Sequence, residues 1–164
     1  MKIHHRRSIR LKGYDYTQNG CYFLTICTRN RECLFGEIQN ANMFLSNIGE
    51  KVRVCWQEIP NHFPQIVLHE YVIMPNHLHG IIEIRNTDSQ IIPSFPTRSN
   101  GTSRTLGSVV RGFKIGVTKR VGFSPWQRNY YEHIIRNSVA YNHIVQYMAQ
   151  NPMKWEEDCF YDGF

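Results

Sequence analysis

The chain has 164 residues, of which 41% are hydrophobic and 20% charged, and its formal net charge is +6. This length suits a single domain, residues 1–164, with one moderate core, and the composition is ordinary for a globular protein. No apolar run approaches the roughly 20 residues that a membrane span needs. The basic N-terminus also lacks the apolar segment of a secretory signal. The sequence therefore predicts a cytoplasmic protein that does not contact a membrane.

The cysteines agree with that location. There are five of them, an odd number, and no CxxC pair occurs. This pattern favours reduced thiols over a disulfide framework or a cysteine-zinc site.

In chain order, the first predicted element is a strand. CYFLTICTR (21–29) is rich in β-branched and aromatic residues and has no helical period. Residues 32–46 then favour a short hairpin around the segment QNAN. Ser46 or Asn47 can cap a helix that runs to about Ile59, because apolar residues recur there at steps of three and four.

The middle of the chain predicts a second hairpin. QIVLHEYVIM (65–74) and HLHGIIEIR (77–85) are two further strands, and the turn between them is Pro75-Asn76. The segment that follows, 86–103, is rich in Ser, Thr, Asn and Pro, which indicates a flexible surface loop. Two interpretations remain open for this loop: a tolerated insertion, or a segment that closes on a ligand.

The last part of the chain alternates helix, strand and helix. TLGSVVRGFKIGVTKRVG (105–122) has a helical period, YYEHIIR (130–136) predicts a strand, and Asn137 or Ser138 caps a final helix that ends near Gln150. The predicted order β-α-β-β-α-β-α is that of an α+β, ferredoxin-like split βαβ fold. Its antiparallel sheet would carry helices mainly on one face.

Basic residues gather in two stretches. They are Arg6, Arg7, Arg10 and Lys12 at the start, and Arg104, Arg111, Lys114, Lys119 and Arg120 further on. Net charge alone does not separate a polyanion partner from ordinary surface lysines. Interleaved basic and aromatic residues, as in WQRNYY (126–131), favour a nucleic-acid surface, where cations meet phosphates and unpaired bases stack.

The segment MPNHLHG (74–80) holds two histidines one residue apart. In a strand, alternate side chains share a face, so His77 and His79 project together while Leu78 points into the core. Two imidazoles placed in this way can chelate one divalent metal, or they can simply be satisfied by hydrogen bonds. The motif alone does not decide between these interpretations, and it supplies neither a third ligand nor a nucleophile.

The final helix supplies candidates for both. Its core stripe is formed by Tyr141, Ile144, Val145 and Met148. Tyr147 lies roughly 110° from the centre of that stripe, at 100° per residue. His143 and Asn151 lie on the same flank, one turn before it and one turn after it. Tyr147 is therefore either an ordinary half-exposed tyrosine or a member of a polar row able to bind a metal or a phosphate.

Taken in order, these motifs resemble a known family. MPNHLHG after an apolar strand, then SVVRGFKIGVTKR, WQRNYYEHIIRN and YNHIVQYMAQNP, resemble the single-tyrosine HUH transposases, in particular those associated with repetitive extragenic palindromes (REPs). RRSIRLKGYDY and NRECLFGEI near the start are similar to that group as well. The resemblance covers nearly the whole chain.

The resemblance implies specific roles. His77 and His79 match the HUH metal ligands, Tyr147 matches the nucleophile, and Asn151 matches the third ligand. Such enzymes cut single-stranded DNA with Mg²⁺ or Mn²⁺ and no nucleotide cofactor. They leave a 5′-phosphotyrosine and a free 3′-OH. His143 is a hypothetical acceptor for the tyrosine proton.

The implied partner is single-stranded or hairpin DNA, bound by a monomer or a homodimer. The expected DNA contacts are Arg6, Arg7, Arg10, Arg111, Lys114 and Arg128. Trp126 or Tyr130 is a candidate to stack on bases, although core packing is the favoured interpretation of Trp126. Two features depart from the family: the long loop 86–103, and a chain that stops soon after the last helix. The second departure leaves open how the tyrosine helix is held, and whether it serves its own chain or a partner.

Two other functions remain as alternatives. The first is a domesticated module that binds a DNA or RNA hairpin without cutting it. The presence of all four candidate catalytic residues argues against this alternative, because a non-catalytic relic would be free to lose them. The second is an unrelated metallohydrolase, which would need further His or Asp ligands. The histidines other than His77, His79 and His143 show no ligand spacing; they are His4, His5, His62, His69 and His133.

Overall fold

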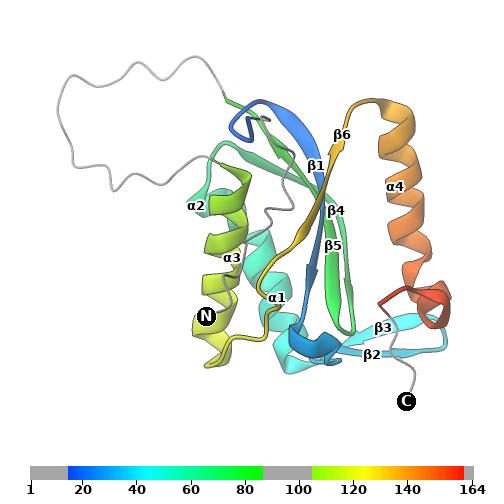
Figure 1. Cartoon of the computed structure of the whole chain (residues 1–164). Helices are drawn as coiled ribbons and strands as arrows, with labels where there is room; N and C mark the ends of the chain where they lie inside the picture. Colours follow the sequence, from blue (N-terminus) through cyan, green and yellow to red (C-terminus); the bar gives the residue numbers. More distant parts are fainter. Residues whose placement is uncertain (1–14, 87–104, 161–164) are drawn as a thin grey trace, which may run out of the picture.

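The computed structural model describes residues 15–86 and 105–160 (Figure 1). Arg6, Arg7, Arg10 and nearly all of the loop 86–103 therefore lie outside the described residues. Within them, four strands form one sheet in the order β4-β5-β1-β6, and every neighbouring pair is antiparallel. The strands are β1 (Gly20–Cys27), β4 (Ile66–Met74), β5 (His77–Ile84) and β6 (Tyr131–Ile135). Because β5 lies between β1 and β4, this is the predicted split βαβ arrangement, and the ferredoxin-like fold is confirmed.

The predicted first hairpin is also present. It consists of β2 (Gly36–Gln39) and β3 (Asn42–Leu45), which form a separate two-stranded sheet. The two turn residues, Asn40 and Ala41, both have positive φ, 49° and 61°. That backbone is the one a two-residue turn between twisted strands requires.

Side-chain caps set the starts of the longer helices. Ser46 accepts a hydrogen bond from the backbone of Gly49 at the start of α1 (Asn47–Gln57). Thr105 caps α3 (Leu106–Val121) and Asn137 caps α4 (Ser138–Gln150) in the same way. The first helix ends slightly earlier than expected, and a separate turn, α2 (Ile59–His62), follows with Pro60 in its first positions. Proline is tolerated there because its missing N–H has no acceptor in a first turn.

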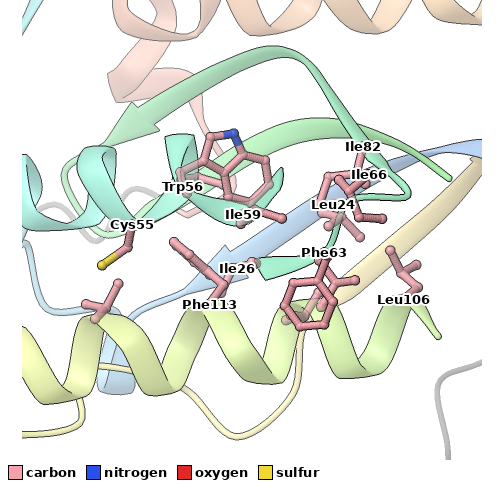
Figure 2. Close-up of a cluster of buried hydrophobic side chains, with 14 of the residues drawn as sticks. Leu24, Ile26, Cys55, Trp56, Ile59, Phe63, Ile66, Ile82, Leu106 and Phe113 are labelled. Carbon is pink, nitrogen blue, oxygen red and sulfur yellow. The ribbon is translucent and has the colours of Figure 1, made fainter. Parts of the chain in front are cut away.

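The helices cover both faces of the sheet. α1, α2 and α3 lie on one face and α4 lies alone on the other (Figure 1). The main core fills the first interface, with Trp56, Phe113 and Leu24 among its buried side chains (Figure 2). A smaller cluster under α4 contains Ile81, Ile135 and Met148. Side chains at odd positions of β5 therefore face α4, and those at even positions face the main core.

Two short 3-10 segments complete the described chain. They are η1 (Arg29–Arg31), directly after β1, and η2 (Asn151–Glu157), directly after α4. No helix in the described part of the chain is long and apolar enough to cross a membrane.

Candidate active site

The histidine pair lies at the start of β5, on the face covered by α4. Both imidazoles are buried, and their Nε2 atoms are 3.1 Å apart. Leu78 between them packs in the main core, as the strand period predicts. The antiparallel partners of His77 are Cys27 on β1 and Met74 on β4, so strands on both sides hold the backbone here.

Neighbouring side chains decide which ring nitrogens face each other. His77 Nδ1 lies 2.8 Å from Oδ1 of Asn76. The Asn76 amide is oriented by its own NH₂ group, which donates to the carbonyls of Arg31 and Phe160. Because an amide oxygen can only accept, Nδ1 of His77 carries the proton and its Nε2 carries a lone pair. Thr25 Oγ1 lies 2.8 Å from Nδ1 of His79 and orients the second ring. A hydroxyl can donate or accept, so this contact leaves the tautomer of His79 open to either form.

Both imidazoles are neutral in this setting. Burial, and then the neighbouring imidazole of His79, lowers the pKa of His77 to about 2. Burial lowers the pKa of His79 to about 4. Desolvation disfavours the imidazolium, so at neutral pH each ring offers a lone pair rather than a charge. Two neutral, buried imidazoles whose Nε2 atoms converge are a donor pair that a divalent cation can accept.

α4 brings the tyrosine and the asparagine to the pair. The Tyr147 hydroxyl lies 3.3 Å from Nε2 of His79, while the residue is 43% exposed and so accessible from outside. Asn151, at the start of η2, is only 4% exposed, and its Oδ1 has no hydrogen-bond partner. A buried oxygen without a donor is uncommon, and it fits the oxygen ligand that Mg²⁺ or Mn²⁺ would need. The structure thus brings together all four residues that the sequence singled out.

The hypothetical proton acceptor has a different position. His143 lies on an exposed part of α4, and the imidazole that contacts the Tyr147 hydroxyl is His79 instead. Burial raises the pKa of Tyr147, the hydrogen bond with Asn151 offsets part of that rise, and the nearby Asp158 carboxylate raises the pKa further.

Sequence reasoning missed the segment after η2, which returns to the histidine pair. The Phe160 ring centroid is 4.7 Å from that of His77, and Arg31 donates to the Cys159 carbonyl. Asp158 Oδ2 lies 3.9 Å from Nε2 of His77. No spacing rule links Asp158 to a motif so far away in the chain, so the sequence carried no signal for this contact.

A cavity of about 460 Å³ includes in its lining Phe160, the residue whose ring packs on His77. Its lining residues are Arg29, Asn30, Arg31, Gln127, Tyr131 and Phe160. Asn30 and Arg31 have positive φ, 52° and 57°. Such backbone is uncommon in residues other than glycine, and it concentrates at binding sites.

The described basic candidates have three different settings. Arg128 is exposed and follows Gln127, which lines the cavity. Arg111 is exposed on α3, on the opposite face of the sheet from the histidines (Figure 1). Lys114 donates to the carbonyls of Gln127 and Asn129, 2.8 and 3.0 Å away, so its ammonium is held by the protein itself. Trp126 is 5% exposed, in agreement with its favoured interpretation as core.

Tyr141 departs from its predicted place in the core. Its ring packs against the smaller cluster between α4 and the sheet, but the residue is only partly buried. Its hydroxyl donates to Glu70 and contacts Nδ1 of His69. The register of β4 shifts between Leu68 and Tyr71, at the bulge that carries both partners. The helical stripe placed the ring correctly, but it had no information about the polar groups that a bulge brings to the same face.

Comparisons with known proteins place the chain among relatives. It is 51% identical, over 97% of its length and 94% of the other, to an uncharacterized protein of Haemophilus influenzae. It is 24% identical to a putative REP-associated tyrosine transposase of H. influenzae and 25% identical to the REP-associated tyrosine transposase of Escherichia coli. Those two matches cover 85% of this chain, and 74% and 70% of the respective relatives. No family model matches.

Among solved structures, the chain resembles a REP-associated tyrosine transposase bound to a REP hairpin, with a TM-score of 0.65 and 24% identity. The match covers 91% of this chain and 74% of that one, and it supports the same fold. The motif order and the sequence relatives thus relate the chain to the REP-associated tyrosine transposases, and the solved structure shows that it shares their fold.

Proposed function

We propose that the protein is a metal-dependent endonuclease and transposase for single-stranded DNA. It would cleave and rejoin its substrate through a covalent 5′-phosphotyrosine, at hairpin-forming repeat sequences. One observation carries the proposal. The accessible Tyr147 hydroxyl lies 3.3 Å from a buried imidazole whose Nε2 converges with that of a second neutral histidine. The candidate nucleophile Tyr147 therefore lies directly beside the candidate metal ligands His77 and His79.

Tyr147 would act as the nucleophile. Its hydroxyl oxygen forms a bond to the scissile phosphorus, and the bond from phosphorus to the 3′ oxygen breaks. The leaving oxygen takes up a proton and becomes a free 3′-OH, while the tyrosine proton passes to solvent. Because the pKa of Tyr147 is raised by burial, the resting hydroxyl keeps its proton until attack. The phosphodiester energy is retained in the adduct, so rejoining is the reverse reaction.

His77, His79 and Asn151 would hold the metal, Mg²⁺ or Mn²⁺. When bound, the ion polarises the scissile phosphate and neutralises the charge that develops on it. The chain's own contribution is to present neutral nitrogen donors and the unpartnered Asn151 oxygen in a buried, fixed arrangement.

The substrate class is inferred from the relatives and from the basic surface. The resembling solved transposase is bound to a REP hairpin, which supports a hairpin or single-stranded DNA as the partner. We place the strand beside Arg128 and the cavity, with Arg6, Arg7 and Arg10 as further expected contacts. Arg111, on the opposite face, would meet DNA only where it wraps around the sheet, and Lys114 would position the segment 127–129.

The tyrosine would serve its own chain. Tyr147 lies at the histidine pair of its own molecule, with its hydroxyl 3.3 Å from Nε2 of His79. This supports cleavage in cis, which a monomer can perform.

A cleavage assay tests the proposal. Wild type and Tyr147→Phe would be incubated with single-stranded oligonucleotides from the DNA flanking the gene, with Mn²⁺ or Mg²⁺. The readout is a protein–DNA band that survives denaturation. Tyr141→Phe is the matched control. It also removes a tyrosine hydroxyl from α4, but that hydroxyl is hydrogen-bonded to Glu70 and not to the histidine pair.

We expect an adduct with wild type and with Tyr141→Phe, and none with Tyr147→Phe. An adduct that persists in Tyr147→Phe would refute the nucleophile assignment. Tight hairpin binding by all three proteins with no adduct would favour the non-catalytic hairpin-binding module.

A further inference from the structure

Asp158 places a buried carboxylate at the histidine pair. Its side chain is 3% exposed, and Oδ2 lies 3.9 Å from Nε2 of His77. Three possible ligand atoms, one each from His77, His79 and Asp158, all lie within 4.8 Å of one another. Carboxylates are rarely buried unless they are paired or bound to a metal.

The two oxygens of this carboxylate have different surroundings. Oδ1 accepts a hydrogen bond from the backbone N–H of Phe160 at 2.8 Å. Oδ2 faces Nε2 of His77, which carries a lone pair because the proton of that ring is on Nδ1 and bonded to Asn76. Two acceptors therefore face each other across 3.9 Å, beyond hydrogen-bond distance. A cation between them would satisfy both.

The segment that carries Asp158 is fixed to the site from several sides. The backbone N–H of Asp158 donates to the Trp155 carbonyl at the end of η2. The Asn76 NH₂ group, whose amide also orients His77, donates to the Phe160 carbonyl at 2.7 Å. Arg31 donates to the Cys159 carbonyl at 3.1 Å. The same asparagine thus positions an imidazole and the backbone beside the carboxylate.

We propose that Asp158 is a fourth protein ligand of the metal, together with His77, His79 and Asn151. The inference rests on the metal site of the proposed function. Its chemical reason is charge: two neutral imidazoles and an amide oxygen carry no net charge, whereas Mg²⁺ and Mn²⁺ favour anionic oxygen ligands. Asp158 supplies that charge and a hard oxygen donor from a segment held at the site.

Mn²⁺ binding without DNA tests the assignment. The affinities of wild type, Asp158→Asn and Glu157→Gln would be compared by calorimetry. Asp158→Asn keeps the shape of the side chain, and Glu157→Gln removes an exposed neighbouring charge. We expect Asp158→Asn to weaken binding by about ten-fold or more, at least the loss seen when a residue supporting a ligand is removed. Glu157→Gln should leave the affinity unchanged.

The outcomes separate this inference from the proposed function. If wild type binds no Mn²⁺, the metal site itself is wrong and the ligand assignment fails with it. If wild type binds and Asp158→Asn binds equally well, only the assignment of Asp158 fails. If Asp158→Asn binds Mn²⁺ as tightly as wild type but binds DNA more tightly, the carboxylate occupies the place of a phosphate. That result would also overturn the assignment of Asp158 as a ligand.

A change of donor gives a second, independent readout. In Asp158→Cys a soft thiolate replaces the carboxylate, so a ligand role predicts a shift in preference from Mn²⁺ towards Cd²⁺. Glu157→Cys adds a thiol one residue away and controls for Cd²⁺ binding to surface cysteines, including the exposed Cys159. Equal Cd²⁺ preference in the two variants would contradict the proposal, since a purely structural Asp158 would not change metal selectivity.

Discussion

The Asn76 side-chain oxygen lies 2.8 Å from Nδ1 of His77, and the Asn76 NH₂ group donates to two backbone carbonyls. One amide therefore sets the tautomer of a candidate ligand and also ties η1 to the segment beyond η2. Metal ligands depend on such partners for their orientation and their basicity.

Asn76→Ala is expected to weaken Mn²⁺ binding about 10- to 100-fold, the usual cost of losing a residue that orients a ligand. Calorimetry on the DNA-free protein measures it. Asn76→Asp keeps the acceptor for His77 but loses both donated bonds, so it should retain more affinity than Asn76→Ala. Equal losses in both variants would mean that the tie to the backbone, rather than the tautomer, is what matters.

Gly80, the last residue of the histidine motif, is required by packing. A Cβ built on it would lie 2.4 Å from Cζ2 of the Trp56 indole, which is itself buried. Gly80→Ala should therefore destabilise the fold by about 1–3 kcal/mol, the usual cost of overpacking a core. Urea unfolding measures the change.

Gly116→Ala on α3 is the control for Gly80→Ala. A Cβ there meets only the Cys55 sulfur at an ordinary 3.8 Å. Alanine is favoured over glycine inside a helix, so this variant should be neutral or stabilised by up to about 1 kcal/mol. If both glycine variants lost the same stability, the clash with Trp56 would not be the cause.

Variants of Lys114 and Arg128 should have different effects: the first should lower the stability of the fold, and the second should weaken DNA binding. Lys114→Ala removes the donor of two hydrogen bonds to the segment 127–129, and we expect a loss of about 1–3 kcal/mol in unfolding free energy. Arg128 is exposed, so Arg128→Ala should change stability by less than about 0.5 kcal/mol.

DNA binding by the Arg128 variant, measured at several salt concentrations, completes the comparison. Loss of one phosphate contact should reduce the slope of log affinity against log salt by about 1. An unchanged slope would remove Arg128 from the DNA path. A stable Lys114→Ala variant with the same slope change would mean that its ammonium meets phosphate after all.

The Tyr141 hydroxyl predicts an alkaline pH dependence of stability. Burial raises the pKa of Tyr141 to about 12, with further contributions from the hydrogen bond to Glu70 and its charge. The unfolded chain releases this proton near pH 10. Between about pH 10 and about pH 12 the folded state thus binds more protons than the unfolded state, and stability falls as the pH rises through that window.

Tyr141→Phe lacks this proton and isolates its effect from the other titrating groups. Wild type should be more stable than the variant by about 1 kcal/mol below pH 10, and the difference should shrink as the pH approaches 12. Urea midpoints of both proteins across that range measure it. A difference that stays constant with pH would show that the folded state does not retain the tyrosine proton.

Much of the framework was accessible from the sequence. The strand period placed His77 and His79 on one face with Leu78 on the other. The helical period separated the core stripe of α4 from the flank that carries Tyr147 and Asn151. These inferences succeed because they concern residues on one element, where a fixed repeat and burial of one face decide orientation. The order of the elements then led to the split βαβ sheet.

The tertiary structure alone decided the rest. Asp158 meets His77 from more than 80 positions away, Asn76 binds both the pair and the returning backbone, and Lys114 is held by carbonyls rather than by solvent. A β-bulge in β4 gave the Tyr141 hydroxyl polar partners that no helical pattern contains. Such contacts join distant segments through irregular turns and 3-10 segments, which have no period from which a partner can be read. The sequence thus determined which residues could do the chemistry, and chain packing determined what orients and completes them.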